Sequence, residues 1–300
     1  MCFFTIFTPT YNRAYTLSIL YNSLKNQTCK DFEWLIVDDG STDNTCELVR
    51  EYIKEEKKFP INYYKKENGG KPRAINYGIK LAKGKYFLMI DSDDYLVDNA
   101  VANMKNWCKE IDKDERFVGV GAARGYEKNV YIKGVEPLVN ENGYIDATNL
   151  QRERYNLDAD MTEAYKTNIF KKYPMAEWSG ENFAPEQIAL NEIALAGYKL
   201  RWHKDIICIC KYLPDGLTKG SFELERKNPM GYAMMYNHML KYPDSLKNKY
   251  HAACQHIALS LYGKHPKYIW KSNKLWLTIL ALPIGIVLSV RRKKQFDKKW

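Results

Sequence analysis

The stretch that most constrains this chain is Tyr86–Tyr95, in which an apolar run ends abruptly in three carboxylates within four positions. An unbroken apolar run of this length is typical of a strand that is buried on both faces of a parallel sheet. If the chain stays extended, Asp91 and Asp93 point to the same side, because strand side chains alternate. Two like charges at a buried strand end repel unless a cation lies between them. Hard carboxylate oxygens suit Mg²⁺ or Mn²⁺, so the spacing predicts a metal-binding pair. The alternative is an acidic turn that caps the next helix.

Two earlier segments repeat this arrangement of an apolar run that stops at polar residues. The run F-F-T-I-F leads into Thr8–Arg13, and the run W-L-I-V leads into Asp38–Asp43. Helical spacing follows each of them, and a further strand at Ile61–Tyr64 precedes a helix at Arg73–Ala82. This alternation predicts an α/β fold with a doubly wound, mainly parallel sheet flanked by helices. Ligands bind at the carboxyl ends of such strands, so the polar clusters should share one rim.

The composition is compatible with one large α/β domain and an appendage, or with two small domains, because 45% of the 300 residues are apolar. Seven cysteines without a CxxC pair argue against a disulfide framework and fit a reducing compartment. Cys208 and Cys210 alternate in an apolar run and are expected to be core thiols on one side of a strand. A metal held there with His203 is the minor alternative. The N-terminus has no basic n-region, which argues against a signal peptide.

The loop after the first strand reads T-P-T-Y-N-R and contains no glycine. A dinucleotide-binding fold would place glycines here, so that helix amides could hold the pyrophosphate. Diphosphate charge would instead have to be met by the metal and by cations such as Lys71 and Arg73. An aromatic ring such as Tyr11 and an acceptor such as Asp39 are suited to a nucleobase.

Four motifs, in their order and spacing, resemble those of the family 2 inverting glycosyltransferases of GT-A fold: T-P-T-Y-N-R, D-D-G-S-T-D, N-G-G-K-P-R-A-I-N-Y-G and D-S-D-D. The resemblance covers roughly residues 3–100 closely. As a set the motifs are very specific, although each one alone is weak. The resemblance implies a nucleotide-sugar donor, Mn²⁺ or Mg²⁺ as cofactor, and the bacterial capsule and exopolysaccharide type of enzyme.

By this resemblance, Asp93 and Asp91 would hold the metal, and all three loops would hold the donor nucleotide. Lys71 and Arg73 are the looser part of the assignment. The donor-nucleotide residues that it implies are Thr8, Pro9, Tyr11, Arg13, Asp38, Asp39, Lys71, Arg73, Asp91 and Ser92.

The half of the chain after residue 100 carries weaker patterns. Val118–Ala123 is predicted to be a strand, and Tyr144–Tyr155 is interpreted as a linker rich in Asn and charge. Asp158–Asp160 spells a second D-x-D, but no apolar strand precedes it, so we interpret it as a solvated loop. Leu200–Tyr212 predicts a strand, and Pro214–Thr218 predicts a turn after it.

A helix that is predicted to begin at Pro185 carries the candidate base. The helix dipole favours the ionised form of Glu186 in its first turn. Inverting transfer needs a carboxylate that takes the proton of the acceptor hydroxyl. The family usually has Glu-Asp here, whereas this chain has Glu186 followed by Gln187, so the role falls to Glu186 by elimination. A glutamate that only complements the dipole is the alternative, and Glu181 and Glu192 are weaker candidates.

The tail contains sixteen residues without a charge, Leu275–Val290. As a helix this segment spans about 24 Å, less than the ~30 Å hydrocarbon core, and Pro283 is expected to kink it. The last ten residues supply +5 of the formal net charge of +10, so basicity is a property of the tail rather than of a nucleic-acid-binding face. Cations flank both ends, which favours a segment that dips into or lies on the membrane over a true span. A buried C-terminal helix is the alternative.

The sequence therefore predicts a GT-A domain over 1–225, with a nucleotide-binding half over 1–100 and an acceptor half over 101–225. A helical extension over 226–274 and a membrane-associating segment over 275–300 follow. The expected activity is transfer of a sugar, with inversion, from a nucleotide-sugar donor to a hydroxyl of a lipid-linked or growing glycan. The expected donor is a UDP-sugar, and the expected location is the cytoplasmic face of the plasma membrane. Two alternatives stay open: transfer to polyprenyl phosphate, and a non-catalytic membrane-bound scaffold that binds nucleotide-sugars.

Overall fold

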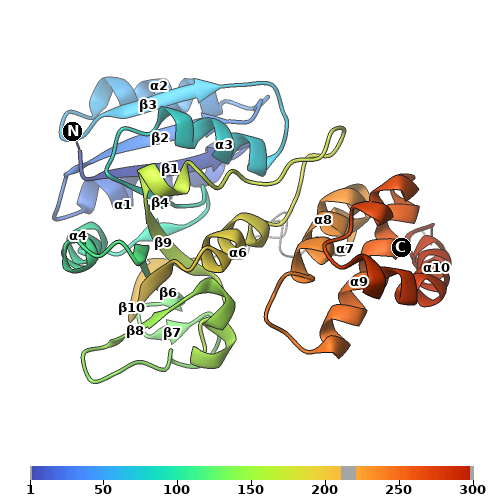
Figure 1. The fold of residues 1–300 in the computed structure, drawn as a ribbon. Coiled ribbons are helices and arrows are strands. Elements are labelled where there is room, and N and C mark those ends of the chain that lie inside the picture. Colours follow the sequence, from blue (N-terminus) through green and yellow to red (C-terminus); the bar gives the residue numbers. More distant parts are fainter. Residues whose placement is uncertain (1, 211–220, 298–300) are drawn as a thin grey trace. The chain divides into compact units, whose positions relative to one another are not determined.

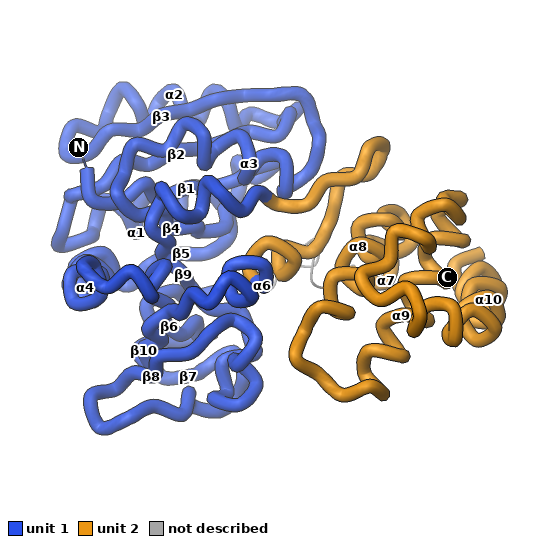
Figure 2. The backbone as a smooth tube through the Cα atoms, viewed as in Figure 1, with its two compact units in different colours: residues 1–174, 191–213 blue, residues 175–190, 214–300 orange. Residues whose placement is uncertain are grey.

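The computed structural model of the chain describes residues 2–210 and 221–297, and its backbone divides into two compact units (Figures 1 and 2). Unit 1 comprises residues 1–174 and 191–213, and unit 2 comprises residues 175–190 and 214–300. The turn predicted at Pro214–Thr218 lies outside the described residues. The strands are β1 (Phe4–Thr10), β2 (Phe32–Asp38), β3 (Ile61–Lys65), β4 (Tyr86–Met89), β5 (Tyr95–Leu96), β6 (Phe117–Glu127), β7 (Val130–Tyr131), β8 (Tyr144–Ala147), β9 (Met161–Lys166) and β10 (Lys199–Ile209).

Helices connect these strands and make up unit 2. In chain order the helices are α1 (Ala14–Asn26), α2 (Thr45–Glu55), α3 (Lys71–Leu81), α4 (Ala100–Ile111), the 3₁₀ helix η1 (Asn149–Tyr155), α5 (Thr167–Phe170), α6 (Gln187–Leu195), α7 (Ser221–Lys227), α8 (Pro229–Met239), α9 (Leu246–Tyr262), η2 (Pro266–Lys271) and α10 (Leu275–Asp297). The predicted α/β class with a large central sheet is confirmed.

The sheet of unit 1 has the strand order β3-β2-β1-β4-β9-β6-β10-β5. Its first four strands are parallel, and the register places Thr10 opposite Asp38 and Asp38 opposite Lys65. Because the strands end at the same level, the loops that follow them leave from one edge. β9 lies antiparallel between β4 and β6, and β10 runs parallel to β6. The sheet is therefore parallel from β3 to β4 and mixed beyond β4.

Both faces of the sheet are covered by helices, as a doubly wound fold requires. On one face, Leu17 of α1, Val49 of α2 and Met104 of α4 join Phe4 and Trp34 of the strands in one buried cluster. The other face carries α3 and α5, where Gly78 of α3 contacts the ring of Phe7 and Phe170 of α5 lies against Phe87, with ring centroids 5.7 Å apart. The alternating side chains of buried strands supply both layers.

Three local predictions are wrong. β4 ends at Met89, and the acids that follow form a turn in which the Asp94 N–H donates to the Asp91 carbonyl at 3.2 Å. The turn brings the acidic residues close to the sheet, where Arg124 of β6 pairs with Asp94. The segment Tyr144–Tyr155 is not a linker but β8 and η1, because β8 pairs with the edge of β10.

The third wrong prediction concerns the start of α6. The helix begins at Gln187, two residues later than predicted, and its first turn is closed by the Leu190 N–H on the Glu186 carbonyl at 3.2 Å. Glu186 therefore immediately precedes the helix.

Unit 2 is built around α9, whose residues from Ala252 to Ser260 are buried. Helix α8 packs on it through Met230 and Ala233, and α10 packs on it through Leu277 and Ala281. Helix α10 runs through Pro283 as one 23-residue helix. Among residues 2–210 and 221–297, it is the one helix long and apolar enough to cross a membrane by length and composition. The predicted boundary of a GT-A domain at residue 225 stays a prediction.

Candidate active site

The loops after β1 and β2 are tied together at the carboxyl edge of the sheet. The Asn12 N–H donates to Ser41 Oγ at 2.8 Å, and the Thr42 N–H donates to Asn12 Oδ1 at 2.8 Å. Asn12 has a φ of 53°, a left-handed conformation that Asn adopts more readily than most residues. Tyr11 stands at the tip of this loop with 48% of its surface exposed, where its ring can receive a planar ligand.

The Asp39 carboxylate connects the loop after β2 to the turn that precedes α3. It accepts hydrogen bonds from the Gly69 N–H at 3.0 Å and the Gly70 N–H at 2.6 Å, and it pairs with Lys66 at 2.6 Å. Gly40 has a φ of 89°, and a Cβ there would lie 2.8 Å from the Asn68 nitrogen. A glycine is thus required where the two loops meet.

The predicted donor residues divide into exposed and buried ones. Thr8 is fully buried and its Oγ1 accepts a hydrogen bond from Trp34 Nε1 at 3.0 Å. Asp38 is also fully buried and accepts from the Ser41 N–H at 2.7 Å and from the Tyr63 hydroxyl. Pro9 is buried beside Thr8, whereas Arg13 is half-buried and donates to the Tyr15 hydroxyl at 2.8 Å. The buried residues shape the loops, and their direct contact with a nucleotide stays a prediction.

The start of α3 brings cations to the acid cluster. Lys71 Nζ lies 2.8 Å from Asp91 Oδ1, and Arg73 donates to the Gly69 carbonyl at 2.6 Å. The structure thus joins Asp91 to Lys71, and through the Gly69–Gly70 turn it joins both to Asp39. These residues come from three separate stretches of the sequence, as the prediction of a single rim requires.

Arg124 of β6 completes the cluster and was not identified in the sequence. Its guanidinium lies 2.8 Å from Asp94 and 3.6 Å from Asp91, and its Nε donates to Thr162 Oγ1 at 3.0 Å. Only 9% of this side chain is exposed. The signal in the sequence was a lone arginine that follows the apolar run V-G-V-G-A-A directly.

The electrostatics of the turn follow from burial and from this pairing. Burial acts to raise the pKa of Asp91, but Lys71 and Arg124 outweigh it and hold the pKa at about 2. Burial raises the pKa of Asp93, and the neighbouring Asp91 charge raises it further. Burial also raises the pKa of Asp94, to about 7, against the lowering effect of Arg124. Ser92, between the two predicted metal ligands, is buried.

The donor set fits a hard divalent cation at Asp91 and Asp93. Both ligands are carboxylates, which Mg²⁺ and Mn²⁺ prefer. Burial and, after it, the Asp91 charge raise the pKa of Asp93, and a cation between the two carboxylates would oppose both effects. In the described part of the chain, Asp94, Cys208 and Cys210 also lie within 4.8 Å of one another. Arg124 already supplies positive charge there, 2.8 Å from Asp94, so we assign that cluster no metal.

The alternative metal site with His203 does not form. The His203 ring stacks on Trp107 with centroids 3.9 Å apart and is not part of the thiol cluster. Cys208 and Cys210 are buried free thiols, as predicted. Asp158, in the second D-x-D, lies in a loop and pairs with Lys133.

Glu186, the predicted base, is half-buried and belongs to unit 2. Its weaker rival Glu181 has a different task, because its two oxygens accept from the Met230 and Gly231 N–H groups at 2.8 Å each, at the start of α8. Burial raises the pKa of Glu181, although these hydrogen bonds oppose the rise. Glu192 lies within α6 and is half-buried.

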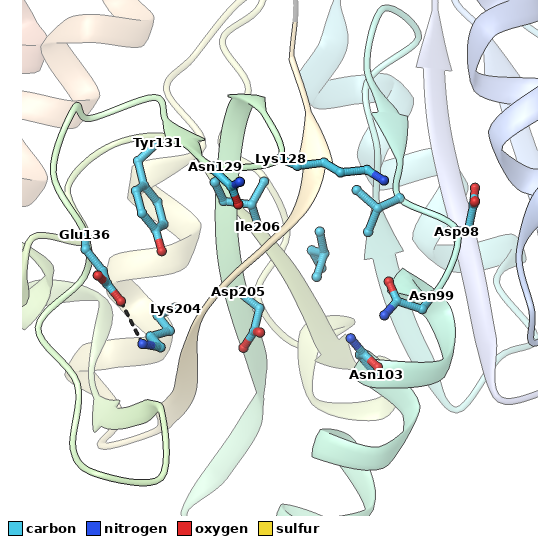
Figure 3. Close-up of a pocket in the computed structure, with 12 residues that line it drawn as sticks. Asp98, Asn99, Asn103, Lys128, Asn129, Tyr131, Glu136, Lys204, Asp205 and Ile206 are labelled. Carbon is cyan, nitrogen blue, oxygen red and sulfur yellow. Dashed lines mark ion pairs between the residues drawn. The ribbon is translucent and has the colours of Figure 1, made fainter.

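A separate pocket of about 580 Å³ opens in unit 1 between the start of α4, the β6–β7 hairpin and β10 (Figure 3). Its wall is mainly polar, with the Lys204–Glu136 ion pair at 2.9 Å on one side and the amides of Asn99 and Asn103 on the other. None of the predicted site residues lines it, and we assign it no role in donor binding.

The chain resembles known proteins in both sequence and fold. The sequence profile of Glycosyl transferase family 2 matches residues 5–173, more than half of the chain. The chain is 23% identical over 227 residues to glycosyltransferase GlyG of Streptococcus pneumoniae, covering 73% of this chain and 74% of GlyG. It is 36% identical to the poly(ribitol-phosphate) beta-glucosyltransferase of Bacillus spizizenii, covering 42% of this chain but only 21% of that protein. It is 39% identical to the chondroitin synthase of Pasteurella multocida, covering 58% of this chain and 16% of that protein.

Solved structures share the fold at low sequence identity. The crystal structure of S. aureus TarS 1–349 in complex with UDP-GlcNAc has a TM-score of 0.63 and 20% identity, and the match covers 97% of this chain and 83% of that chain. The mannosyltransferase PcManGT of Pyrobaculum calidifontis, in complex with GDP-Man and Mn²⁺, has a TM-score of 0.56 and 17% identity, with coverage of 98% and 82%.

Proposed function

The chain belongs to glycosyl transferase family 2, and we propose that it transfers a sugar, with inversion, from a nucleotide-sugar to a hydroxyl of a lipid-linked or growing glycan. A UDP-sugar is the expected donor, and capsular polysaccharide, exopolysaccharide or another cell-surface glycan is the expected product. The names of the glucosyltransferase and chondroitin synthase relatives, and the UDP-GlcNAc bound to the TarS neighbour, support this proposal.

The observation that carries the proposal is the convergence of the loops on one rim. Tyr11 and the Asp39-bound glycine turn lie on its β1–β2 side, and the Lys71–Asp91 ion pair lies toward β4. A nucleoside diphosphate needs a stacking surface and polar acceptors for the base at one end, and cations for the phosphates at the other. The rim offers both in the order that such a ligand requires.

Asp91 and Asp93 would hold Mn²⁺ or Mg²⁺. When bound, the metal supplies positive charge that stabilises the nucleoside diphosphate leaving group. Lys71 contributes a second positive charge next to Asp91, and Arg124 holds the carboxylate turn in place through Asp91 and Asp94. Tyr11, Asp39 and Arg73 orient the nucleotide, so that the anomeric carbon meets the acceptor in line.

The acceptor hydroxyl loses its proton to Glu186 as its oxygen bonds to the anomeric carbon, while the bond from that carbon to the diphosphate oxygen breaks. The configuration inverts because attack and departure occur on opposite sides. Glu186 immediately precedes α6, and its carboxylate can serve as the general base that inverting transfer requires. Glu181 is less suited because both of its oxygens already accept N–H groups of α8.

A lipid-linked acceptor requires the enzyme to work at a membrane, which we place at the cytoplasmic face. The exposed apolar surface of α10 and the basic residues around it support this location.

The decisive experiment measures release of UDP from a panel of UDP-sugars with Mn²⁺ or Mg²⁺. We expect metal-dependent release by the wild type and a loss of at least a hundredfold in Asp93→Ala. Asp160→Ala, in the second D-x-D, is the matched control and should retain wild-type release. Equal activity of Asp93→Ala and wild type would contradict the metal assignment. Nucleotide-sugar binding without turnover for any donor would favour the scaffold alternative.

The base is tested separately, with a saccharide acceptor present. Glu186→Gln should lose transfer but keep donor binding, because glutamine is nearly isosteric and cannot take a proton. Full transfer by Glu186→Gln to polyprenyl phosphate would support the rival acceptor, which is already anionic and needs no base.

A further inference from the structure

Helix α10 is apolar around its whole circumference for four turns, but only one side of it is packed. Leu277 and Ala281 are buried in the cluster that α10 shares with α9. Gly285 belongs to the same side, and a Cβ there would lie 2.6 Å from Ile257 Cβ of α9. The approach of the two helices is therefore close along this side.

The opposite side of α10 faces away from α9 and carries large apolar side chains. Trp276, Leu280 and Val287 are 55%, 61% and 65% exposed, and Ile279, Ile286 and Val290 are between 48% and 55% exposed. These positions recur at the spacing of one helix face. The outward face of a helix in a water-soluble domain is normally polar, so an apolar one marks a contact with a partner or a lipid.

Charge identifies which partner fits this outward face. Lys271 and Lys274 precede α10, and Arg291, Lys293 and Lys294 lie in its last two turns. Trp270 and Trp276, both more than half exposed, stand at its beginning. Cations attract anionic lipid headgroups, and tryptophan is enriched at the level of the headgroups.

We propose that α10 lies in the plane of an anionic membrane surface, with its outward face among the upper acyl chains and its inward face still on α9. This proposal refines the membrane location given above and does not depend on the transferase reaction. An in-plane helix of 23 residues covers about 35 Å of membrane surface.

A transmembrane orientation of α10 is disfavoured because the helix would lose its packing on α9 and its polar contacts within unit 2. Leu277 and Ala281 are 4% and 0% exposed and would lose their packing on α9. The last turns are also held, because Arg292 pairs with Glu225 and donates to Gln255 at 2.6 Å. Insertion across the bilayer would break this ion pair or carry it into hydrocarbon.

A second copy of the chain fits the face less well than lipid does. A two-fold dimer places the same patch of both copies together. Because α10 is flanked by cations at both ends, either a parallel or an antiparallel pairing of two such helices brings like charges together.

The test is co-sedimentation of the full chain with vesicles of phosphatidylglycerol and phosphatidylcholine. We expect binding that weakens with salt and is much weaker for pure phosphatidylcholine. Leu280→Ser with Val287→Ser should reduce partitioning by about tenfold for each side chain, since burial of one aliphatic side chain is worth roughly that factor. The matched control is Val135→Ser with Leu138→Ser, two exposed apolar residues of unit 1, which should bind as the wild type does.

UDP release by the α10 variant should equal that of the wild type. Failure of the membrane proposal can then be distinguished from failure of the proposed transferase activity. Unchanged vesicle binding of the α10 variant would overturn the proposal. A dimer in solution that the same substitutions dissociate, without vesicle binding, would assign the face to a second copy.

Depth distinguishes a helix in the plane from one that spans. In Val287→Trp, the new ring lies near the middle of α10. The fluorescence that this variant adds to that of the wild type, which already contains Trp270 and Trp276, should be quenched by lipids brominated near the headgroup more than by lipids brominated near the bilayer centre. The reverse order would show a span and overturn the proposal.

Discussion

Replacement of Arg124 by glutamine gives a sharp test of how the acid turn is held. Arg124 is nearly buried and contacts Asp94 at 2.8 Å, Asp91 at 3.6 Å and Thr162 at 3.0 Å. Removal of one partner of a buried ion pair leaves the other charge uncompensated, which costs about 3–5 kcal/mol. Asp91 keeps Lys71, so the loss falls mainly on Asp94.

The stability that Arg124→Gln loses should depend on pH. Burial raises the pKa of Asp94 to about 7, above its value in the unfolded chain. A raised pKa in the folded state means that the neutral form stabilises the fold at low pH and that this stabilisation is lost as the pH rises through 7. Neutral Asp94 needs no cation, so Arg124→Gln should be less destabilising at pH 6 than at pH 8.

Thermal unfolding measures this prediction, with Arg124→Gln/Asp94→Asn as the matched control. The single variant should unfold roughly 6–20 °C below the wild type at pH 8, since each kcal/mol shifts the midpoint by about 2–4 °C in a domain of this size. The double variant has no uncompensated charge and should recover most of the loss. A single variant within about 2 °C of the wild type, or a double variant that is worse, would refute the reasoning.

Three further predictions follow from individual contacts. Asp39→Asn replaces a carboxylate that accepts two N–H groups and pairs with Lys66, so the KM for UDP-sugar should rise at least tenfold and the unfolding free energy should fall by about 1–3 kcal/mol. A loss of stability with an unchanged KM would mean that Asp39 has only a structural role. Burial, and secondarily Arg201, lowers the pKa of His203 to about 3, so below pH 6.5 the unfolded chain binds a proton on this imidazole that the folded chain does not. In urea unfolding between pH 6 and 4, His203→Phe should therefore reduce the fall of unfolding free energy with pH by about 1.4 kcal/mol per pH unit, and equal pH slopes for variant and wild type would contradict this. Gly78→Ala places a Cβ 2.1 Å from the Phe7 ring. The overpacking costs about 1–3 kcal/mol, which should outweigh the roughly 1 kcal/mol gained in helix propensity, so the midpoint of thermal unfolding should fall.

The parallel part of the sheet, from β1 to β4, could be predicted from sequence because its signals are local. Each parallel strand is an apolar run that ends at polar residues, and the parallel order then places those residues on one edge. Lys71 and Asp91 meet for this reason, although twenty positions separate them in the sequence. The extended D-x-D failed because the backbone hydrogen bond from Asp94 to Asp91 closes a turn that alternation alone does not reveal.

The second half could not be predicted to the same depth because its signals are not local. The strand β8 is an edge strand of four residues with a charged member, Asp146, and its partner β10 lies more than fifty positions away. Arg124 looked like a lone arginine because its acidic partners are thirty or more positions earlier in the chain. Hydropathy identified the apolar tail correctly, but the face of α10 that packs on α9 is decided by Gly285 and its contact with Ile257.

The charge balance of the turn explains how three carboxylates can stay in place before any metal arrives. When Asp91, Asp93 and Asp94 are all ionised, they lie near two cations, Lys71 and Arg124, and one negative charge is left in excess. Arg124 is buried and bound to Thr162, which makes it a fixed part of the scaffold, whereas Lys71 is partly exposed at the start of a helix. A divalent cation at the proposed Asp91–Asp93 site would therefore compete with Lys71 for Asp91. The diphosphate of the proposed donor would resolve that competition, because its negative charge could accommodate Lys71 and the metal together. We therefore expect metal and nucleotide to bind more tightly as a pair than the metal does alone.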